Sequence, residues 1–464
     1  MSLFDSGEVR SLEDVHAVFT RWLGKSYDLT ALDAVLSAAA VEQLDGDPVW
    51  LLVVSGSGNA KTETVSALGG AGAHVTSTIT SEGALLSATA KKEVSKEATG
   101  GLLRKIGGTG VLVIKDVTSI LSMNRDSRSA VLAALREVYD GRWERNVGTD
   151  GGRSLTWEGR IVLVGAVTTA YDQAHAVIAS MGDRFALVRV DSNLGRLEAG
   201  RQALHNVGSE VQMRQELSDA VGVVLAAVEP SNAVLTAEVM TVLLGTANLV
   251  TLARTAVERD HRGEVVEAHA PEAPTRFAKM LGQIVRGVLS LGATPERALE
   301  VALRVAGDSV PPLRLLVLTD VLGHPDSRTS EVTKRVQRPR TTVDRALQEL
   351  HLLGLVVIDD VGDGGWRYSV APSVDRVALV RTFTRNVSTG GYGEIERPLH
   401  GGTDKSGDAL SRVPHGTPDA KPTPAAACEI CGLPGEHLDA EGYPYCKRCR
   451  ANAEQLHLAR KAIA

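Results

Sequence analysis

Two short patterns in this chain combine residue types that can do chemistry. The first is SGSGNAKT, which follows the apolar run VWLLVV and ends at Lys61 and Thr62. A strand that passes through a permissive turn into a helix aims backbone N–H groups at an anion, and a lysine there reaches the outer phosphates of a nucleotide. The general pattern G-x-x-x-x-G-K-[ST] is altered at Ser55 and Ala60. An ordinary strand–turn–helix corner is the alternative.

This pattern predicts a site for ATP with Mg²⁺, in which Lys61 binds phosphate and Thr62 binds the metal. The loop residues expected to hold the nucleotide are Gly56, Ser57, Gly58, Asn59, Ala60, Lys61 and Thr62.

The second pattern is C-x₂-C-x₁₄-C-x₂-C, formed by Cys428, Cys431, Cys446 and Cys449. Each C-x₂-C pair suits a turn that presents two thiolates to a tetrahedral Zn²⁺. Four protein ligands complete the coordination sphere, so we predict a structural zinc. This spacing also favours a reducing compartment over a disulfide framework.

Further polar residues adjoin the other apolar runs. Asp116 follows GVLVI, Thr168 follows RIVLVGAV, and Arg184 precedes FALVRV. Near-continuous apolar runs that alternate with helical patterns predict a parallel sheet covered by helices on both faces. We expect the acidic and the threonine strand ends to lie beside the phosphate loop.

The chain is too long for one domain, and its pattern predicts six segments. They are an N-terminal helical segment (1–48), an α/β nucleotide-binding core (49–190), a helical lid without strands (191–305), a winged helix (306–373), a Gly- and Pro-rich linker (374–427), and the four-cysteine module with a terminal helix (428–464).

Composition is that of an ordinary globular protein, with 43% apolar and 23% charged residues and a formal net charge of −6. No overall basic excess points to nucleic acid, so any such contact must come from local patches. The chain has no run of about 18 apolar residues and no secretory signal pattern. We therefore expect a cytoplasmic protein without a membrane span.

Two basic patches are candidates for DNA contact. The segment WERNVGTDGGRSLTW predicts a hairpin, and the candidate residues in it or directly before it are Arg142, Arg145 and Arg153. The winged helix contributes Arg335, Arg338, Arg340 and Arg345 around its third helix, the element that enters a major groove in such motifs. The alternatives are a solvated charged hairpin and a winged helix that binds protein.

Residues 49–290 resemble AAA+ ATPases, and among them the minichromosome-maintenance helicases and the enhancer-binding activators. SGSGNAKT is similar to the helicases' phosphate loop G-D-P-G-x-A-K-S, and SEGALLSATAKKE is similar to their insert near helix 2. MGDRFALVRVD is similar to the segment that carries their arginine finger. The resemblance implies an α/β P-loop NTPase (AAA+) fold.

The resemblance also implies roles for single residues. Arg184 would act in trans on a neighbour's ATP, Thr168 would replace the usual sensor asparagine, and Arg276 would be the sensor-2 arginine. The family's acidic motif ends in Asp-Glu, but this chain has Lys115 and Asp116 there. Either Asp116 serves both tasks or hydrolysis is slow.

These features together predict an ATP hydrolase that forms a homo-oligomer, in a ring, and couples ATP to remodelling or unwinding DNA. The resemblance further implies a place in phage or mobile-element DNA replication, with a replication partner at the zinc module. One alternative is a DNA-binding transcriptional regulator that ATP switches, and another is a helicase loader.

Overall fold

The computed structural model of the 464-residue chain describes residues 11–88, 99–148, 151–174, 183–191, 195–360, 365–387, 437–438 and 444–445. The chain divides into two units, Met1–Val387 and Ser388–Ala464. In the second unit, β12 (His437–Leu438) pairs antiparallel with β13 (Pro444–Tyr445).

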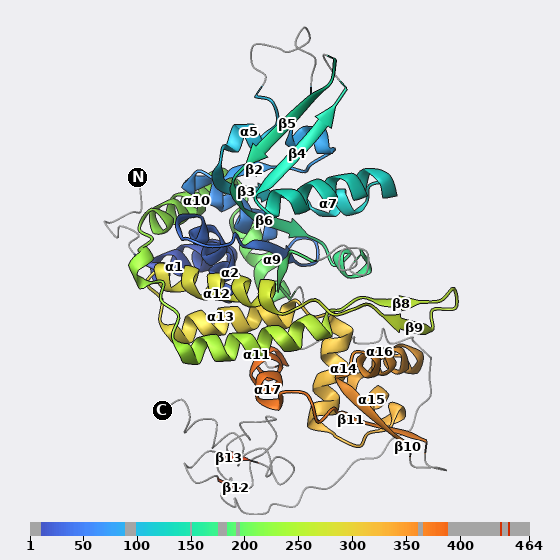
Figure 1. Cartoon of the computed structure of the whole chain (residues 1–464). Coiled ribbons are helices and arrows are strands. Elements are labelled where there is room, and N and C mark those ends of the chain that lie inside the picture. The colour runs from blue at the N-terminus through green and yellow to red at the C-terminus, as the bar shows by residue number, and fades with distance from the viewer. Residues whose placement is uncertain are drawn as a thin grey trace, which may run out of the picture. The chain divides into compact units, whose positions relative to one another are not determined.

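A parallel five-stranded sheet forms the α/β core of the first unit (Figure 1). Its order is β2-β3-β6-β1-β7, and every neighbouring pair is parallel. The strands are β1 (Trp50–Val54), β2 (His74–Thr76), β3 (Thr109–Ile114), β6 (Arg160–Val167) and β7 (Ala186–Arg189). The four longer strands match the predicted apolar runs, whereas β2 has only three residues and too short a pattern to predict.

Helices cover both faces of the sheet, as expected. Side chains alternate along β1, so that Leu51 and Val53 join one core and Trp50, Leu52 and Val54 join the other. The second core is completed by α4 (Glu82–Leu85), α5 (Leu102–Ile106), α6 (Thr118–Leu121), α7 (Arg125–Tyr139) and the hairpin of β4 (Arg142–Val147) and β5 (Arg153–Glu158).

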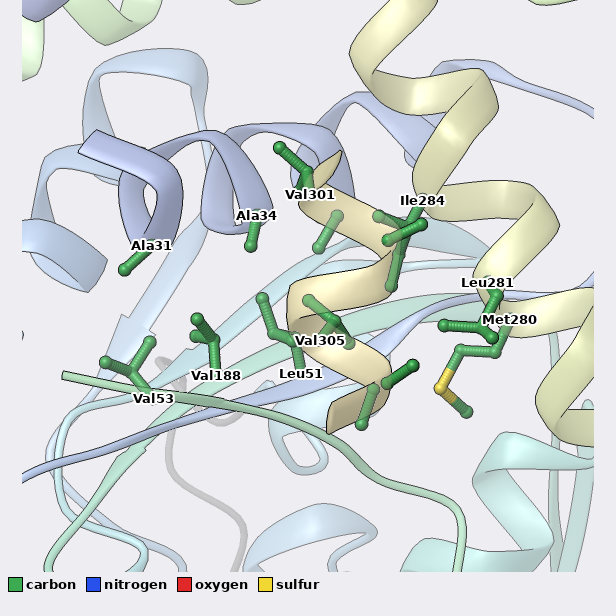
Figure 2. Packing of buried hydrophobic residues seen from close by; sticks show 14 of the residues in the cluster. Ala31, Ala34, Leu51, Val53, Val188, Met280, Leu281, Ile284, Val301 and Val305 are labelled. Carbon is green, nitrogen blue, oxygen red and sulfur yellow. The ribbon is translucent and has the colours of Figure 1, made fainter. Parts of the chain in front are cut away.

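The first core contains most of the other helices of the sheet region. They are α1 (Leu12–Leu23), α2 (Leu29–Ala40), α3 (Lys61–Ser66), α10 (Glu210–Ala226), α11 (Ala237–Ala253), α12 (Thr275–Ser290) and α13 (Pro295–Asp308), with the short 3-10 turns η1 (Val41–Gln43) and η2 (Ala67–Ala71). Helix α9 (Arg196–His205) and the 3-10 turn η5 (Pro230–Asn232) have no buried residue. Figure 2 shows side chains of α2, β1, β7, α12 and α13 meeting in this core.

Helix α2 is buried on nearly all sides, with ten of its twelve residues buried. Such a helix is stable only inside a core, where each large aliphatic side chain contributes about 1.5–3 kcal/mol. Helix α12 approaches it closely, because a Cβ on Gly287 would lie 2.3 Å from the carbonyl oxygen of Ser37. The predicted N-terminal segment is thus packed into the core of the first unit.

The segment 191–305, predicted to lack strands, contains an antiparallel hairpin of β8 (Val257–Arg259) and β9 (Val265–Ala268). Its turn is closed by bonds from the Asp260 N–H to Glu264 and from the Gly263 N–H to Asp260. The expectation of an all-helical lid was wrong here, because these short strands mix charged with apolar residues and show no clear alternation.

Three helices and a hairpin follow, here called the helix–hairpin unit (312–370). They are α14 (Pro312–Gly323), α15 (Thr329–Val336), α16 (Arg340–Leu352), β10 (Val356–Asp360) and β11 (Trp366–Val370). Helix α17 (Arg376–Val387) then occupies the first part of the range predicted as linker, and its Leu379 and Phe383 are fully buried. Thr382 is hydrogen-bonded to Thr246 of α11 at 3.2 Å, so this helix packs on the lid.

Candidate functional site

Three of the predicted polar segments lie at one edge of the sheet. The phosphate loop follows β1, Asp116 follows β3, and Thr168 follows β6. These strands are parallel neighbours in the order β3-β6-β1, so their carboxyl ends meet at the same edge. In open α/β sheets, ligands bind outside this edge.

The loop itself has the backbone of a tight strand-to-helix turn. Ala60 lies in the left-handed region with φ 52°, and Gly58 has φ 87°. The Lys61 ammonium donates to the Gly56 carbonyl oxygen at 2.8 Å, and the Ser55 hydroxyl donates to the same oxygen at 2.9 Å. Ser55 is buried, and its N–H continues the sheet by donating to the Val167 carbonyl oxygen.

The lysine of this loop is electrostatically suited to an anion. Partial burial lowers the pKa of Lys61, and the carboxylates of Asp116 and Glu63 only partly oppose that effect. A phosphate beside the ammonium would favour its charged form. Thr62, the next residue, is exposed at the start of α3.

The segment that follows β3 is hydrogen-bonded to the end of β6, since the Val117 N–H donates to the Ala166 carbonyl oxygen at 2.9 Å and Thr118 contacts Thr168. The Thr168 N–H donates to the Thr118 hydroxyl oxygen at 3.0 Å, and that hydroxyl donates to the Thr168 hydroxyl at 3.3 Å. Asp116 is exposed, and its carboxylate accepts from the Ser119 N–H at 3.3 Å. The two strand ends therefore form one hydrogen-bonded surface beside the loop.

Residues outside the phosphate-loop motif hold helix α3 and the 3-10 turn after it, η2, in place. The Tyr27 and Thr64 hydroxyls are hydrogen-bonded at 2.7 Å, and burial raises the pKa of Tyr27. Helix α10 packs on η2 at close range, because a Cβ on Gly222 would lie 2.6 Å from the Gly70 carbonyl oxygen.

Arg189 is a further charged residue at this edge that the strand pattern does not single out. It pairs in register with Val54, the residue before the loop. Its guanidinium donates to Asp172 at 2.7 and 3.0 Å and to the carbonyl oxygen of Asp308 at 2.7 Å. In the sequence, Arg189 is marked only by its position at the end of an apolar run.

Arg184 and Arg276 lie together at the opposite edge. Arg184 precedes β7, donates to Asp140 at 2.8 Å and lies over the ring of Tyr139. Arg276 begins α12 and donates to Glu272 at 3.0 Å. The register puts this edge level with Val49, and Val49 to Ser55 spans about 20 Å of strand at about 3.3 Å per residue. One chain does not bring these arginines to its own phosphate loop.

The predicted hairpin is formed by β4 and β5, and its arginines differ in their surroundings. Arg142 is exposed and lies 3.5 Å from Glu158. Arg145 donates to Glu82 at 2.8 Å and to the Leu86 carbonyl oxygen at 2.8 Å, so it holds the hairpin against α4. Arg153 starts β5.

The arginines of the helix–hairpin unit also divide into two groups. Arg335 donates to both oxygens of Asp320 at 2.8 and 2.7 Å, and Arg345 donates to Glu264 of the β8–β9 hairpin at 3.1 Å. Both therefore contribute to the fold. Arg338 and Arg340 lie at the start of α16, and Arg340 is exposed.

The predicted zinc ligands Cys428, Cys431, Cys446 and Cys449 lie outside the described residues. Within the part of the chain that is described, no group of three or more His, Cys, Asp or Glu residues is arranged to hold a metal. None of the helices described there is both long and apolar enough to cross a membrane.

No protein-family model and no curated protein sequence matches this chain. Among solved structures, it is similar to the A form apo structure of the NrS-1 C-terminal region, at 12% identity and a TM-score of 0.30 over 80% of each chain. A second apo structure of that region gives 10% identity and a TM-score of 0.27 over 78% of this chain and 77% of that one. TM-scores this low carry no argument about fold or function.

Proposed function

We propose that this chain is an AAA+-type ATPase that binds Mg²⁺-ATP at the phosphate loop and uses its hydrolysis to remodel DNA. The observation that carries the proposal is the meeting of Lys61, Asp116 and Thr168 at one carboxyl edge of a parallel sheet. The residues fit the nucleotide, since the backbone of the loop is turned and the Lys61 ammonium is partly desolvated.

Each residue has a distinct task in this proposal. Lys61 binds the outer phosphates, Thr62 and Asp116 orient Mg²⁺ or water, and Thr168 contacts the outermost phosphate. Bound Mg²⁺-ATP supplies the transferable phosphoryl group, and phosphoryl transfer depends mainly on positioning and charge stabilisation.

The site is completed by a second copy of the chain in this proposal. Arg184 and Arg276 lie about 20 Å from the loop of their own chain, along strands that rise about 3.3 Å per residue. Their pairing on one edge supports delivery to a neighbour's phosphate, and hence a homo-oligomer of ring type.

DNA is the proposed substrate of the assembly. The exposed Arg142 of the β4–β5 hairpin and the arginines at the start of α16 supply cationic surface for phosphates. The helix–hairpin unit would then be a winged helix, the four cysteines would bind zinc and contact a replication partner, and the protein would act in the cytoplasm.

ATP turnover with no DNA, single strands or duplex tests the proposal. We expect turnover that DNA stimulates and that Lys61→Ala and Arg184→Ala each abolish. The matched control is Lys105→Ala, which removes an exposed lysine from α5. Turnover that persists at wild-type rate in Lys61→Ala would refute the nucleotide site.

A second candidate is a DNA-binding regulator that ATP switches without unwinding. Lys115 favours it, because the end of β3 has a lysine where the resemblance leads one to expect the metal-binding aspartate. ATP binding without turnover, together with sequence-specific duplex binding, would support this candidate over the first.

A further inference from the structure

Asp183 is a buried carboxylate that directly precedes Arg184. Its carboxylate accepts from the Phe185 N–H at 2.9 Å, which fixes the turn into β7. Its backbone carbonyl oxygen accepts from Arg276 at 3.4 Å. The positions of Arg184 and Arg276, at the edge where the strands begin, therefore both depend on Asp183.

Arg254 connects Asp183 to the lid. It caps the end of α11, only 4% of its side chain is exposed, and it lies 3.9 Å from the Asp183 carboxylate. It also donates to Glu272 at 2.8 Å, and Glu272 in turn pairs with Arg276. Separating a buried pair leaves an uncompensated charge, so these groups move together or not at all.

Tyr171 connects the Asp183 carboxylate to the edge of the sheet where the phosphate loop lies. Its N–H donates to the Thr168 carbonyl oxygen at 3.0 Å, so it belongs to the turn that begins at Thr168. Its hydroxyl, in a fully buried side chain, donates to Asp183 at 3.5 Å. The turn from Thr168 to Tyr171 thus links Thr168, beside the phosphate loop, to Asp183, which precedes Arg184.

We propose that Asp183 is a positioning residue that couples a subunit's own nucleotide site to the arginines which that subunit presents to its neighbour. Tyr171 and Arg254 are the two arms of this coupling. Movement of the Thr168 turn on nucleotide binding shifts the Tyr171 hydroxyl and, with it, Asp183, Arg184 and Arg276. The inference rests on the proposed function.

Tyr171→Phe tests the coupling because it removes one hydroxyl and leaves the buried ring. Tyr368→Phe, at a fully buried tyrosine of β11, is the matched control. The readouts are nucleotide binding, the thermal midpoint, and the Hill coefficient of ATP turnover. We expect Tyr171→Phe to bind ATP and melt like the control, while its Hill coefficient falls from the wild-type value to about one.

Mixing experiments provide a second readout that a merely structural role would not change. Lys61→Ala subunits added to wild type should inhibit more than in proportion, because a subunit without nucleotide misplaces its arginines. When the inactive subunit carries Tyr171→Phe together with Lys61→Ala, inhibition should become proportional. Wild-type Hill and mixing behaviour in Tyr171→Phe would overturn the coupling.

The failure of this inference differs from the failure of the proposed function. A wild-type protein that hydrolyses ATP with a Hill coefficient of about one overturns the coupling alone. Absence of wild-type turnover overturns the proposed function, and the coupling with it.

Discussion

Ala60 occupies the position where the phosphate-loop pattern has glycine, so replacing it with glycine tests the backbone geometry of the loop. It lies in the left-handed region with φ 52° and ψ 10°, directly before Lys61. A residue with a Cβ pays about 1–2 kcal/mol for that conformation, whereas glycine adopts it without strain. Ala60→Gly should therefore stabilise the folded protein.

The net gain follows from two opposing effects. Relief of the left-handed strain gives about 1–2 kcal/mol, and the greater flexibility of glycine in the unfolded chain removes about 0.5–1 kcal/mol. We expect a gain of about 0.5–1 kcal/mol, which for a chain of this size raises the thermal midpoint by about 1–2 °C. Calorimetry or circular dichroism of the nucleotide-free protein measures the shift.

Two control variants make the result interpretable. Ala199→Gly, at an exposed position inside α9, should lower stability by about 1 kcal/mol because glycine is a poor helix former. Gly58→Ala should also destabilise, because φ 87° disfavours a side chain even though nothing lies within 4 Å of the added Cβ. If Ala60→Gly lowers the midpoint as Ala199→Gly does, Ala60 is not left-handed and the loop geometry is wrong.

Three further predictions concern the lid and its attachments. Phe383→Ala should cost about 3–5 kcal/mol in denaturant unfolding, because the ring is fully buried in α17. Arg314→Ala should cost about 1.5–3 kcal/mol, since it removes the 2.8 Å bond to the buried Glu349 carboxylate, which keeps its bond to Arg259. Burial raises the pKa of Asp308 in the folded protein, and Arg304 opposes that shift. The proton on Asp308 therefore stabilises the fold fully below the ordinary carboxyl pKa of about 4, and this stabilisation is lost as pH rises through the folded-state pKa. Asp308→Asn should remove this part of the loss of stability above about pH 4.

Much of the core could be predicted from local pattern. The apolar runs that form β1, β3, β6 and β7 are short and continuous, as strands buried on both faces must be. Because parallel strands end at one edge, the order of elements was enough to group Lys61, Asp116 and Thr168. Helix and strand periodicity is a property of neighbouring residues, which is why it can be seen in the sequence.

The partners of charged side chains were decided only by the tertiary structure. Arg145 and Arg335 have the same appearance in the sequence as Arg142 and Arg340, but Glu82 and Asp320 engage the first two within the fold. Glu82 and Asp320 lie on other elements of the fold, and no periodic pattern in the sequence indicates which arginine each of them pairs with.

The location of the remaining arginines was likewise a tertiary result. The sequence by itself determined that Arg184 precedes a strand and that Lys61 follows one. In a parallel sheet these positions lie at opposite edges, and the register of β1 and β7 fixed the distance between the two residues, because it aligns the start of one strand with the start of the other. The burial of α2 and the packing of α17 on the lid have the same origin, since both depend on apolar surface contributed by residues far away in the chain.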